Sequence, residues 1–481
     1  LLLNLNQLPK SNLMKFNSKF WSPIAASILL LSCSNEKNVE EEVKTTFTGE
    51  KNEIKLLTLD PGHFHAHLVK KSMYEEVDPK VYVYAPDGPE LTSYLKSIES
   101  YNTREEDPTS WELEVYKGDD YLQKMLSEKK GNVMLTAGNN KKKTANIKAT
   151  IEAGINVLAD KPMAIDAQGF ETLKEAFELA EKNDVLLFDI MTERFEITTM
   201  LQREFSLIPE VFGEMEKGTL ENPAITKESI HHFYKQVSGK TLIRPGWFYD
   251  VNQQGNGIVD VTTHLVDLVQ WESFPDKIID YKTDIEMINA KRWTTDLTLE
   301  EFTLSTGLEE FPDYLQSVVS DGLLKVYGNG EINYKINGIH AKVSVIWNYK
   351  APEGSADTHY SIMRGSKANL VIRQDAEENY KPELYIEPVE GQDIAAFEAS
   401  VTKHVKELAS TFEGLDVVKV EGKDSWRVEI PEAFRHGHED HFREVTETYI
   451  DYLEQGKLPD WEVPNMLAKY YVTTQALELA K

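Results

Sequence analysis

Short apolar runs alternate with longer amphipathic segments between residues 54 and 189, and this alternation limits the folds that the chain can adopt. The runs are rich in Val, Ile and Leu, which is typical of strands buried on both faces. Strands that alternate with helices favour a parallel, doubly wound sheet. The expected strands are 54–59, 81–85, 111–116, 132–136, 155–158 and 185–189, and the expected helices are 63–73, 143–152 and 167–182.

The pattern changes after about residue 190. Period-two alternation there predicts an antiparallel sheet with one face against a layer of helices. We therefore predict a Rossmann-type α/β domain over 53–190 and an α+β substrate or oligomerisation domain, with a large and mostly antiparallel sheet, over 191–481. The alternating stretches are 339–348, 359–363 and 368–372, and helices are expected around 198–205, 439–457 and 463–479.

The chain is strongly acidic. It has 52 basic and 80 acidic residues, which give a net charge of −28 at pH 7. This charge repels phosphate backbones and anionic lipid, so we expect no nucleic-acid partner and a small polar ligand instead. The single cysteine, Cys33, excludes an intrachain disulfide and a cysteine-based metal site.

The segment 14–33 has the pattern of an export signal. Lys15 and Lys19 precede an apolar run, and a small residue precedes Cys33. The end of the run, Leu-Leu-Ser-Cys, resembles a bacterial lipoprotein box, which implies that Cys33 carries a lipid after cleavage. We expect an extracytoplasmic protein, in the periplasm or at the outer membrane, that contacts lipid only through this anchor. A polar, flexible tether follows over 34–52.

The first turn of the predicted parallel sheet is a candidate phosphate site, because ligands bind at the carboxyl ends of such strands. It lacks the G-x-G-x-x-G sequence: Gly62 takes the middle position, with Asp60 at the first and His65 at the third. Gly62 still allows the main chain to approach a diphosphate, although Asp60 adds negative charge. This alignment assigns Gly62, His63 and Phe64 to a bound cofactor.

Three polar residues follow other predicted strands. Asp87 stands where a carboxylate would hold a ribose hydroxyl, although aspartate is equally common in turns. Asn139 follows the strand 132–136 and is a second cofactor candidate. Lys161 comes directly after the strand 155–158, in a position to bond a reacting hydroxyl or a cofactor; a surface loop lysine is the alternative.

The stretch 255–271 carries the other candidate chemistry. Two glycines open it, and Asp260, His264 and Asp267 follow at i, i+4 and i+7, on one face of a helix. An imidazole between carboxylates is suited to proton transfer near neutral pH. The alternative is an amphipathic helix with a histidine that is merely hydrogen-bonded.

Two motifs together resemble the Gfo/Idh/MocA oxidoreductase family. They are Ala-Asp-Lys-Pro at 159–162, in which Asp160 stands for the usual Glu, and the glycine-led helix at 255–267. The resemblance covers roughly residues 53 to 481, with a separate branch in the C-terminal part. It implies NAD or NADP as cofactor and a sugar- or polyol-like substrate.

The resemblance also implies roles for individual residues. Lys161, Asp260 and His264 would surround the carbon that gives up hydride, and His264 would accept the proton. The substrate pocket would include Arg244, Trp247 and Asp267.

The segment Gly-His-Phe-His-Ala-His at 62–67 has the H-x-H pattern of metal-dependent amidohydrolases. In a helix, however, only His63 and His67 would share a face. The family alignment accounts for this turn better, so we predict no metal.

Two further histidine groups have structural explanations. The sequence at 435–441 has the H-x-H-x-D-H pattern of metallo-β-lactamase-like hydrolases, but no histidine follows His441 to complete that site. A helix start near the cleft explains it better. His231 and His232 are expected on a solvated or interface strand.

The function that these observations favour is hydride transfer between a secondary alcohol of a sugar-like ligand and a nicotinamide cofactor, with Lys161 polarising the hydroxyl and His264 acting as base. Free NAD is scarce outside the cell, and relatives avoid this shortage by keeping the cofactor tightly bound. The alternatives are a glycoside-cleaving hydrolase or lyase of the same family and a cofactor-free sugar-binding lipoprotein. The exposed face of the second sheet leaves room for a homo-oligomer.

Overall fold

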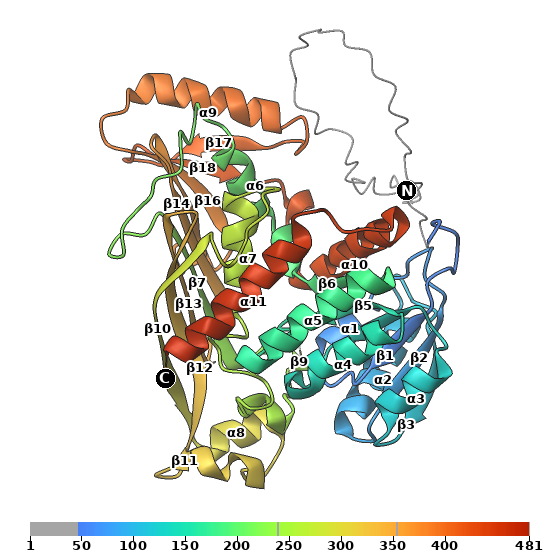
Figure 1. The fold of residues 1–481 in the computed structure, drawn as a ribbon. Helices are drawn as coiled ribbons and strands as arrows, with labels where there is room; N and C mark the ends of the chain where they lie inside the picture. Colours follow the sequence, from blue (N-terminus) through green and yellow to red (C-terminus); the bar gives the residue numbers. More distant parts are fainter. Residues whose placement is uncertain (1–46, 238–239, 353–354, 481) are drawn as a thin grey trace, which may run out of the picture. The chain divides into compact units, whose positions relative to one another are not determined.

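Parallel strands form the sheet of the N-terminal domain, in the order β3-β2-β1-β4-β5-β6 (Figure 1). The computed structural model describes residues 47–237, 240–352 and 355–480. The strand order reverses between β1 and β4, so the predicted doubly wound sheet is confirmed, with its switch point at these two strands. The elements are β1 (Leu56–Leu59), α1 (His65–Leu68), β2 (Lys80–Ala85), α2 (Pro89–Thr103), β3 (Glu112–Lys117), α3 (Tyr121–Glu128), β4 (Val133–Thr136), α4 (Asn140–Glu152), β5 (Asn156–Asp160), α5 (Ala167–Asn183) and β6 (Leu187–Ile190).

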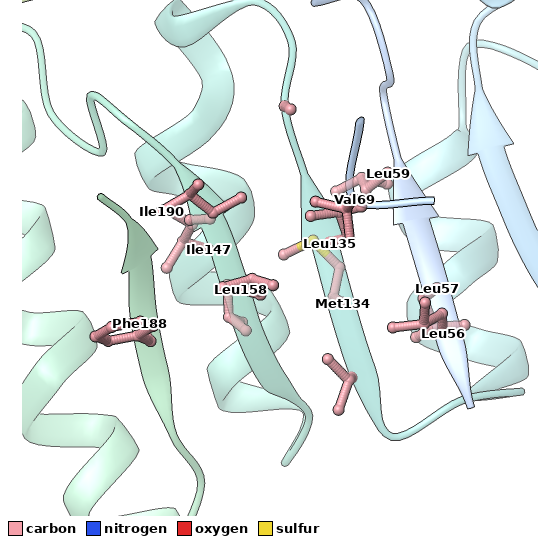
Figure 2. Packing of buried hydrophobic residues seen from close by; sticks show 14 of the residues in the cluster. Leu56, Leu57, Leu59, Val69, Met134, Leu135, Ile147, Leu158, Phe188 and Ile190 are labelled. Carbon is pink, nitrogen blue, oxygen red and sulfur yellow. The ribbon is translucent and has the colours of Figure 1, made fainter. Parts of the chain in front are cut away.

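Apolar side chains pack closely along this sheet. Figure 2 shows Leu57 on β1, Met134 and Leu135 on β4 and Leu158 on β5 among them. Strands β1, β4, β5 and β6 are buried along their whole length. This burial explains why their sequences are almost continuously apolar rather than alternating.

The helix after β1 is shorter than we predicted. The expected range was 63–73, but α1 covers only His65–Leu68. Beyond it, main-chain carbonyls accept from distant side chains: that of Lys70, for example, accepts from Nε1 of Trp111 at 2.7 Å. These tertiary hydrogen bonds replace the helical ones and end the helix, a competition that apolar periodicity does not reveal.

The C-terminal domain is built on a second sheet, in the order β10-β12-β13-β7-β14-β15-β16-β18-β17, with β11 paired to β12 (Figure 1). β7 and β13 are parallel, and the other described pairs of this sheet are antiparallel, so the predicted mostly antiparallel sheet is confirmed. The strands are β7 (Ile225–Tyr234), β10 (Ile285–Leu297), β11 (Val319–Ser320), β12 (Leu323–Ile336), β13 (Ile339–Lys350), β14 (Thr358–Arg364), β15 (Ala368–Arg373), β16 (Glu383–Pro388), β17 (Asp416–Lys419) and β18 (Trp426–Glu429), besides a small ribbon of β8 (Gln236–Val237) and β9 (Lys240–Thr241). The helices and 3₁₀ turns are η2 (Thr192–Phe195), α6 (Ile197–Ser206), η3 (Gly246–Tyr249), α7 (Thr262–Ser273), α8 (Leu299–Thr306), η4 (Asp313–Val318), α9 (Ile394–Leu408), η5 (Glu432–Phe434), α10 (His438–Gln455) and α11 (Glu462–Leu479).

The last two helices contact the first sheet. On α10, the ring of Tyr449 lies parallel to that of Phe188 on β6, with the ring centroids 5.9 Å apart. On α11, the hydroxyl of Tyr470 donates to Asp189 at 2.9 Å. The C-terminal segment therefore completes the core of the N-terminal sheet.

The chain enters α7 through a tight turn. We predicted a helix that includes Asp260, but the structure has turns over 257–261 and begins α7 at Thr262. A Cβ on Gly257 would lie 1.6 Å from the carbonyl oxygen of Gly328 on β12, so only glycine lets the turn pack there. Asp260 lies in this turn, before the helix begins. Its position in the turn separates it from Asp267, which is on α7.

The predicted signal segment 14–33, including Cys33, lies outside the described residues, as does the predicted tether up to residue 46. The lipid anchor and the location it implies therefore stay predictions. Within the described ranges, no helix is long and apolar enough to cross a membrane.

Candidate active site

A cavity of about 1750 Å³ is lined by the carboxyl ends of the parallel strands and by residues of the second sheet. Pockets for one small ligand usually measure roughly 300–1,000 Å³, so this cavity has room for two ligands side by side. The polar residues of its wall include His63, His65, Asn140, Asp160, Lys161, Glu193, His231, Gln254, Asp260, His264, Asp357, His359, His438 and His441.

Lys161 and Asp260 form a buried ion pair in this cavity. Nζ of Lys161, which directly follows β5, lies 2.8 Å from Oδ1 of Asp260, and the two side chains are 9% and 7% exposed. Nε2 of Gln254 donates to the other carboxylate oxygen at 3.0 Å. Burial raises the pKa of Asp260, but the charge and hydrogen bonds of Lys161 and Gln254 outweigh it and hold the pKa below its ordinary value. The ammonium group is thus fixed in orientation.

His264 lies on the first turn of α7 and lines the same cavity. Burial lowers the pKa of its imidazole to about 3, with the nearby charge of Lys161 adding to the effect. Among the described residues, none bonds its Nδ1 atom. The structure thus brings together Lys161, Asp260 and His264, with an imidazole that is neutral at physiological pH and able to accept a proton.

These buried imidazoles make the fold sensitive to acid. Burial lowers the pKa of His264 to about 3 and those of His359 and His441 to about 4, from an ordinary value of 6.5. Below about pH 6.5 the unfolded chain therefore binds protons that the folded chain does not bind. The free energy of unfolding falls as the pH falls towards 4. We expect these three residues to lower the free energy of unfolding by about 2–4 kcal/mol between roughly pH 7 and 5.5.

Urea denaturation at a series of pH values measures this loss. In the His441→Gln variant the loss over the same pH range should be smaller by about 1 kcal/mol, because one of the three imidazoles is gone. An equal loss in the variant and the parent would contradict the assignment.

His63 and His65 converge on Asp160, the last residue of β5. Their Nδ1 atoms lie 3.5 and 3.0 Å from its carboxylate oxygens. His67 points elsewhere and contacts the hydroxyl of Tyr101 at 2.8 Å. The helical phase that would place His63 beside His67 does not apply, because α1 begins only at His65 and His63 lies in the turn before it. Burial lowers the pKa of both imidazoles well below the ordinary value.

A second polar cluster, contributed by the second sheet, lines the same cavity. Asp357 accepts from Nδ1 of both His231 and His232 at 3.1 Å, and Lys235 pairs with it as well. We predicted a solvated or interface strand for these histidines. Both lie on a strand, β7, but the solvated alternative does not hold for His232, which is 3% exposed, and the His231 ring stacks on Trp347. Burial raises the pKa of Asp357, but its contacts with His231, His232 and Lys235 outweigh burial and hold that pKa well below its ordinary value.

The residues that we predicted to line the substrate pocket do not lie together at one wall of the cavity. Arg244 lines the cavity but is buried, and it donates to the main-chain carbonyls of Phe233 and His232. Trp247 covers the first turn, because a Cβ on Gly62 would be 3.4 Å from its indole ring.

Asp267 does not line the described cavity wall. It lies in a buried ion network, where Arg194 donates to both its oxygens at 2.7 Å and Lys469 to one at 2.9 Å. The helical spacing placed it beside His264, but its charge is satisfied by partners far away in the sequence. We predicted that Asp267 lines the substrate pocket. The structure instead gives it a structural role in this ion network.

Of the predicted cofactor residues, His63, Phe64 and Lys161 line the cavity, whereas Gly62, Asp87 and Asn139 are not part of the wall that the structure describes. Asp87 is exposed and pairs with Lys117 at 3.2 Å. Asn139 caps helix α4, where its side chain accepts from the main-chain N–H of Lys141. Turn chemistry explains both residues.

Sequence reasoning missed Glu193 as a site residue. It lies on η2, lines the cavity and sits 3.4 Å from Nδ1 of His438 at the start of α10. Neither Glu193 nor Asp357 belongs to a motif, so no local signal marks them. The histidines at 435–441 do start a helix at the cleft.

The residues present fit the reactive end of a nicotinamide cofactor. Asn140 Oδ1 and Gln254 Oε1 are buried acceptors without a partner among the described residues, and both residues line the cavity near Lys161. Such acceptors suit ribose hydroxyls or a carboxamide. A Cβ on Gly138 would be 2.1 Å from the carbonyl of Asp60, so the two turns at the switch point touch through main chain alone. The first turn departs from the usual pattern, because the four-residue α1 offers no long helix to a diphosphate.

The fold and this site define an α/β protein of the dinucleotide-binding class with an appended sheet domain. Residues 90–189 match the family described as "Oxidoreductase family, NAD-binding Rossmann fold", and residues 201–481 match "Putative oxidoreductase C terminal domain". The chain belongs to the Gfo/Idh/MocA oxidoreductase family, as its motifs suggested.

Solved structures agree with this assignment. The crystal structure of "a putative oxidoreductase" from Parabacteroides merdae is 60% identical, covers 90% of this chain and 99% of its own, and has a TM-score of 0.89. Levoglucosan dehydrogenase in complex with NADH and L-sorbose (12% identity, 89% and 97% coverage, TM-score 0.56) shares the fold. So does a 3-ketoreductase from Actinomadura kijaniata with NADP and TDP-benzene (12% identity, 89% and 98% coverage, TM-score 0.55). A comparison with curated proteins found no match.

Proposed function

We propose that this protein is an NAD(P)-dependent oxidoreductase that acts on a secondary alcohol of a sugar- or polyol-like ligand. The observation that carries the proposal is the convergence of the Lys161–Asp260 ion pair and His264 on one buried cavity. A fixed ammonium donor and a neutral imidazole acceptor are the two groups that oxidation of a hydroxyl requires.

The residues of the chain act on the hydroxyl of the ligand. The Lys161 ammonium, oriented by Asp260, donates to the hydroxyl oxygen and stabilises the negative charge that develops on it. The neutral His264 imidazole accepts the hydroxyl proton. The bound cofactor supplies the hydride acceptor, and Asn140 and Gln254 would hold its ribose and carboxamide. Apolar groups of Leu265, Leu268 and Trp347 on the cavity wall limit the access of water.

The rest of the cavity wall supports a polyhydroxylated ligand. His231 and Asp357 on one side and Glu193 and His438 on another present donors and acceptors to the cavity. A ligand with several hydroxyls can bond to such a wall, whereas an apolar ligand would leave these groups without partners. The two similar folds that bind L-sorbose and a nucleotide-linked ligand are consistent with this class.

A lipid on Cys33, proposed here from the sequence pattern alone, would hold the enzyme outside the cytoplasm. Free NAD is scarce there, so we propose that the cofactor stays bound through the catalytic cycle. A cofactor that is reduced and reoxidised within one cycle also permits cleavage of glycosidic bonds, and the experiment below separates the two outcomes.

The test begins with the purified chain. Denaturation should release a nicotinamide cofactor that is detected by chromatography, or else added NAD or NADP should bind in a fluorescence titration. With polyols or free sugars the loaded protein should form reduced cofactor, whereas sugar released from a glycoside without net reduced cofactor would indicate the cleaving activity. Neither released cofactor nor binding of either dinucleotide would contradict the proposal and favour a sugar-binding protein.

A further inference from the structure

The turn after β1 and the end of β5 bring three potential metal ligands together. His63 Nδ1 lies 3.5 Å and His65 Nδ1 3.0 Å from carboxylate oxygens of Asp160, and one ligand atom of each residue lies within 4.8 Å of the others. Ligands on one zinc ion, each about 2.0–2.2 Å from it, are separated by about 3–3.6 Å in a tetrahedral site. The two separations from Asp160 lie in this range, and the third, which is at most 4.8 Å, would have to shorten for the two imidazoles to share an ion.

One contact in this cluster is not explained by hydrogen bonding within the protein. The main-chain N–H of His65 donates a long hydrogen bond of 3.4 Å to Nδ1 of His63, so this nitrogen carries no hydrogen, and a metal ion would take its lone pair in place of that weak bond. The same nitrogen lies 3.5 Å from a carboxylate oxygen of Asp160, which is also an acceptor. Two acceptors that face each other in a buried site favour a cation between them.

The side chains are buried, yet they reach the cavity. Those of His63, His65 and Asp160 are 13%, 9% and 4% exposed, and all three residues line the cavity wall. Nζ of Lys143 donates to the main-chain carbonyl of Asp160 at 2.9 Å, which helps to fix the end of β5. A bound ion would therefore have three fixed ligands and one position open towards the ligand space.

We propose that His63, His65 and Asp160 bind a divalent transition-metal ion, with the fourth coordination position open to the cavity beside Lys161. Two imidazole nitrogens and one carboxylate oxygen are a ligand set of catalytic zinc sites and of other first-row divalent metals, whereas magnesium and calcium prefer oxygen ligands alone. The metal site does not depend on the proposed oxidoreductase reaction.

The charges around the site indicate what occupies the open position. The carboxylates of Asp160 and Asp260 balance the ammonium groups of Lys143 and Lys161, so a dication adds net positive charge. Net positive charge favours an anionic fourth ligand, which is hydroxide or a deprotonated hydroxyl of the bound ligand. The metal would thus lower the pKa of a hydroxyl at the place where the sugar-like ligand binds.

Metal binding is measured on the full chain after treatment with a chelator, without cofactor or substrate. Titration with Zn²⁺ or Co²⁺ should give one ion per chain, and X-ray absorption of the zinc-loaded protein should show two imidazole ligands. The wild-type measurement needs no variant to fold. Absence of stoichiometric binding below about 10 μM, or a spectrum without imidazole, would overturn the proposal.

Variants locate the site. His65→Ala and Asp160→Asn should each weaken Zn²⁺ binding by at least about 100-fold, because each removes a direct ligand. His67→Ala is the matched control, since it removes an imidazole from the same segment that contacts Tyr101 instead. Unchanged affinity in a folded His65→Ala protein would overturn the assignment. NAD and NADP titrations on the metal-free protein report on the proposed reaction separately, so either proposal can fail alone.

Discussion

Replacing His264 with alanine is expected to lower kcat by about 10²- to 10⁴-fold, the usual contribution of a positioned general base. The imidazole lines the cavity next to the Lys161–Asp260 pair, and the low pKa that burial produces keeps it neutral, the form that has a lone pair for a proton. Its Nδ1 atom has no partner among the described residues, so its removal leaves no donor or acceptor behind. The fold should therefore survive the substitution.

Steady-state rates with saturating cofactor and a reactive polyol measure this effect, and a melting curve verifies the fold. His404→Ala serves as the control, because that imidazole lies on α9 and pairs with Glu407, far from the cavity lining. A His264→Ala enzyme with the turnover of the parent would show that another group takes the proton.

Replacing Arg194 with methionine is expected to cost about 3–5 kcal/mol of stability, the range for breaking a buried ion pair on one side. The guanidinium bonds both oxygens of Asp267 on α7 and pairs with Glu462 on α11 at 2.7 Å. All three side chains are at most 9% exposed, so two carboxylates would be left with too little positive charge. Lys469 would remain as a partner of Asp267 and limit the loss.

Guanidinium chloride denaturation gives the free energy of unfolding for both proteins. Arg427→Met provides the comparison, because its pair with Glu429 is about two-fifths exposed, and exposed pairs contribute about 0–1 kcal/mol. A loss below about 1 kcal/mol for Arg194→Met would mean that water reaches the network in place of the arginine.

The sheets were predictable because their signals are local. Strands such as β4 and β5 are buried throughout and read as apolar runs, and β13 alternates along its length. Where tertiary contacts compete with local ones, prediction failed: α1 ends early because side chains elsewhere bond the carbonyls that follow it.

The site was predictable in part. Lys161 and His264 are carried by family motifs, and the structure places both in one cavity. Asp267 was misplaced because spacing on a helix cannot show that Arg194 and Lys469 come to it from distant segments. The meeting of His63 with Asp160 likewise depends on strand order, which brings β1 and β5 to either side of β4.

The return of α10 to the first sheet has a consequence for biogenesis. Tyr449 packs against Phe188 on β6, so the early domain lacks part of its core until α10 has been made. A nascent chain in which α10 has not yet been synthesised would hold an unfinished apolar surface. The N-terminal sheet can therefore complete its core only once α10 and α11 are available to pack against it.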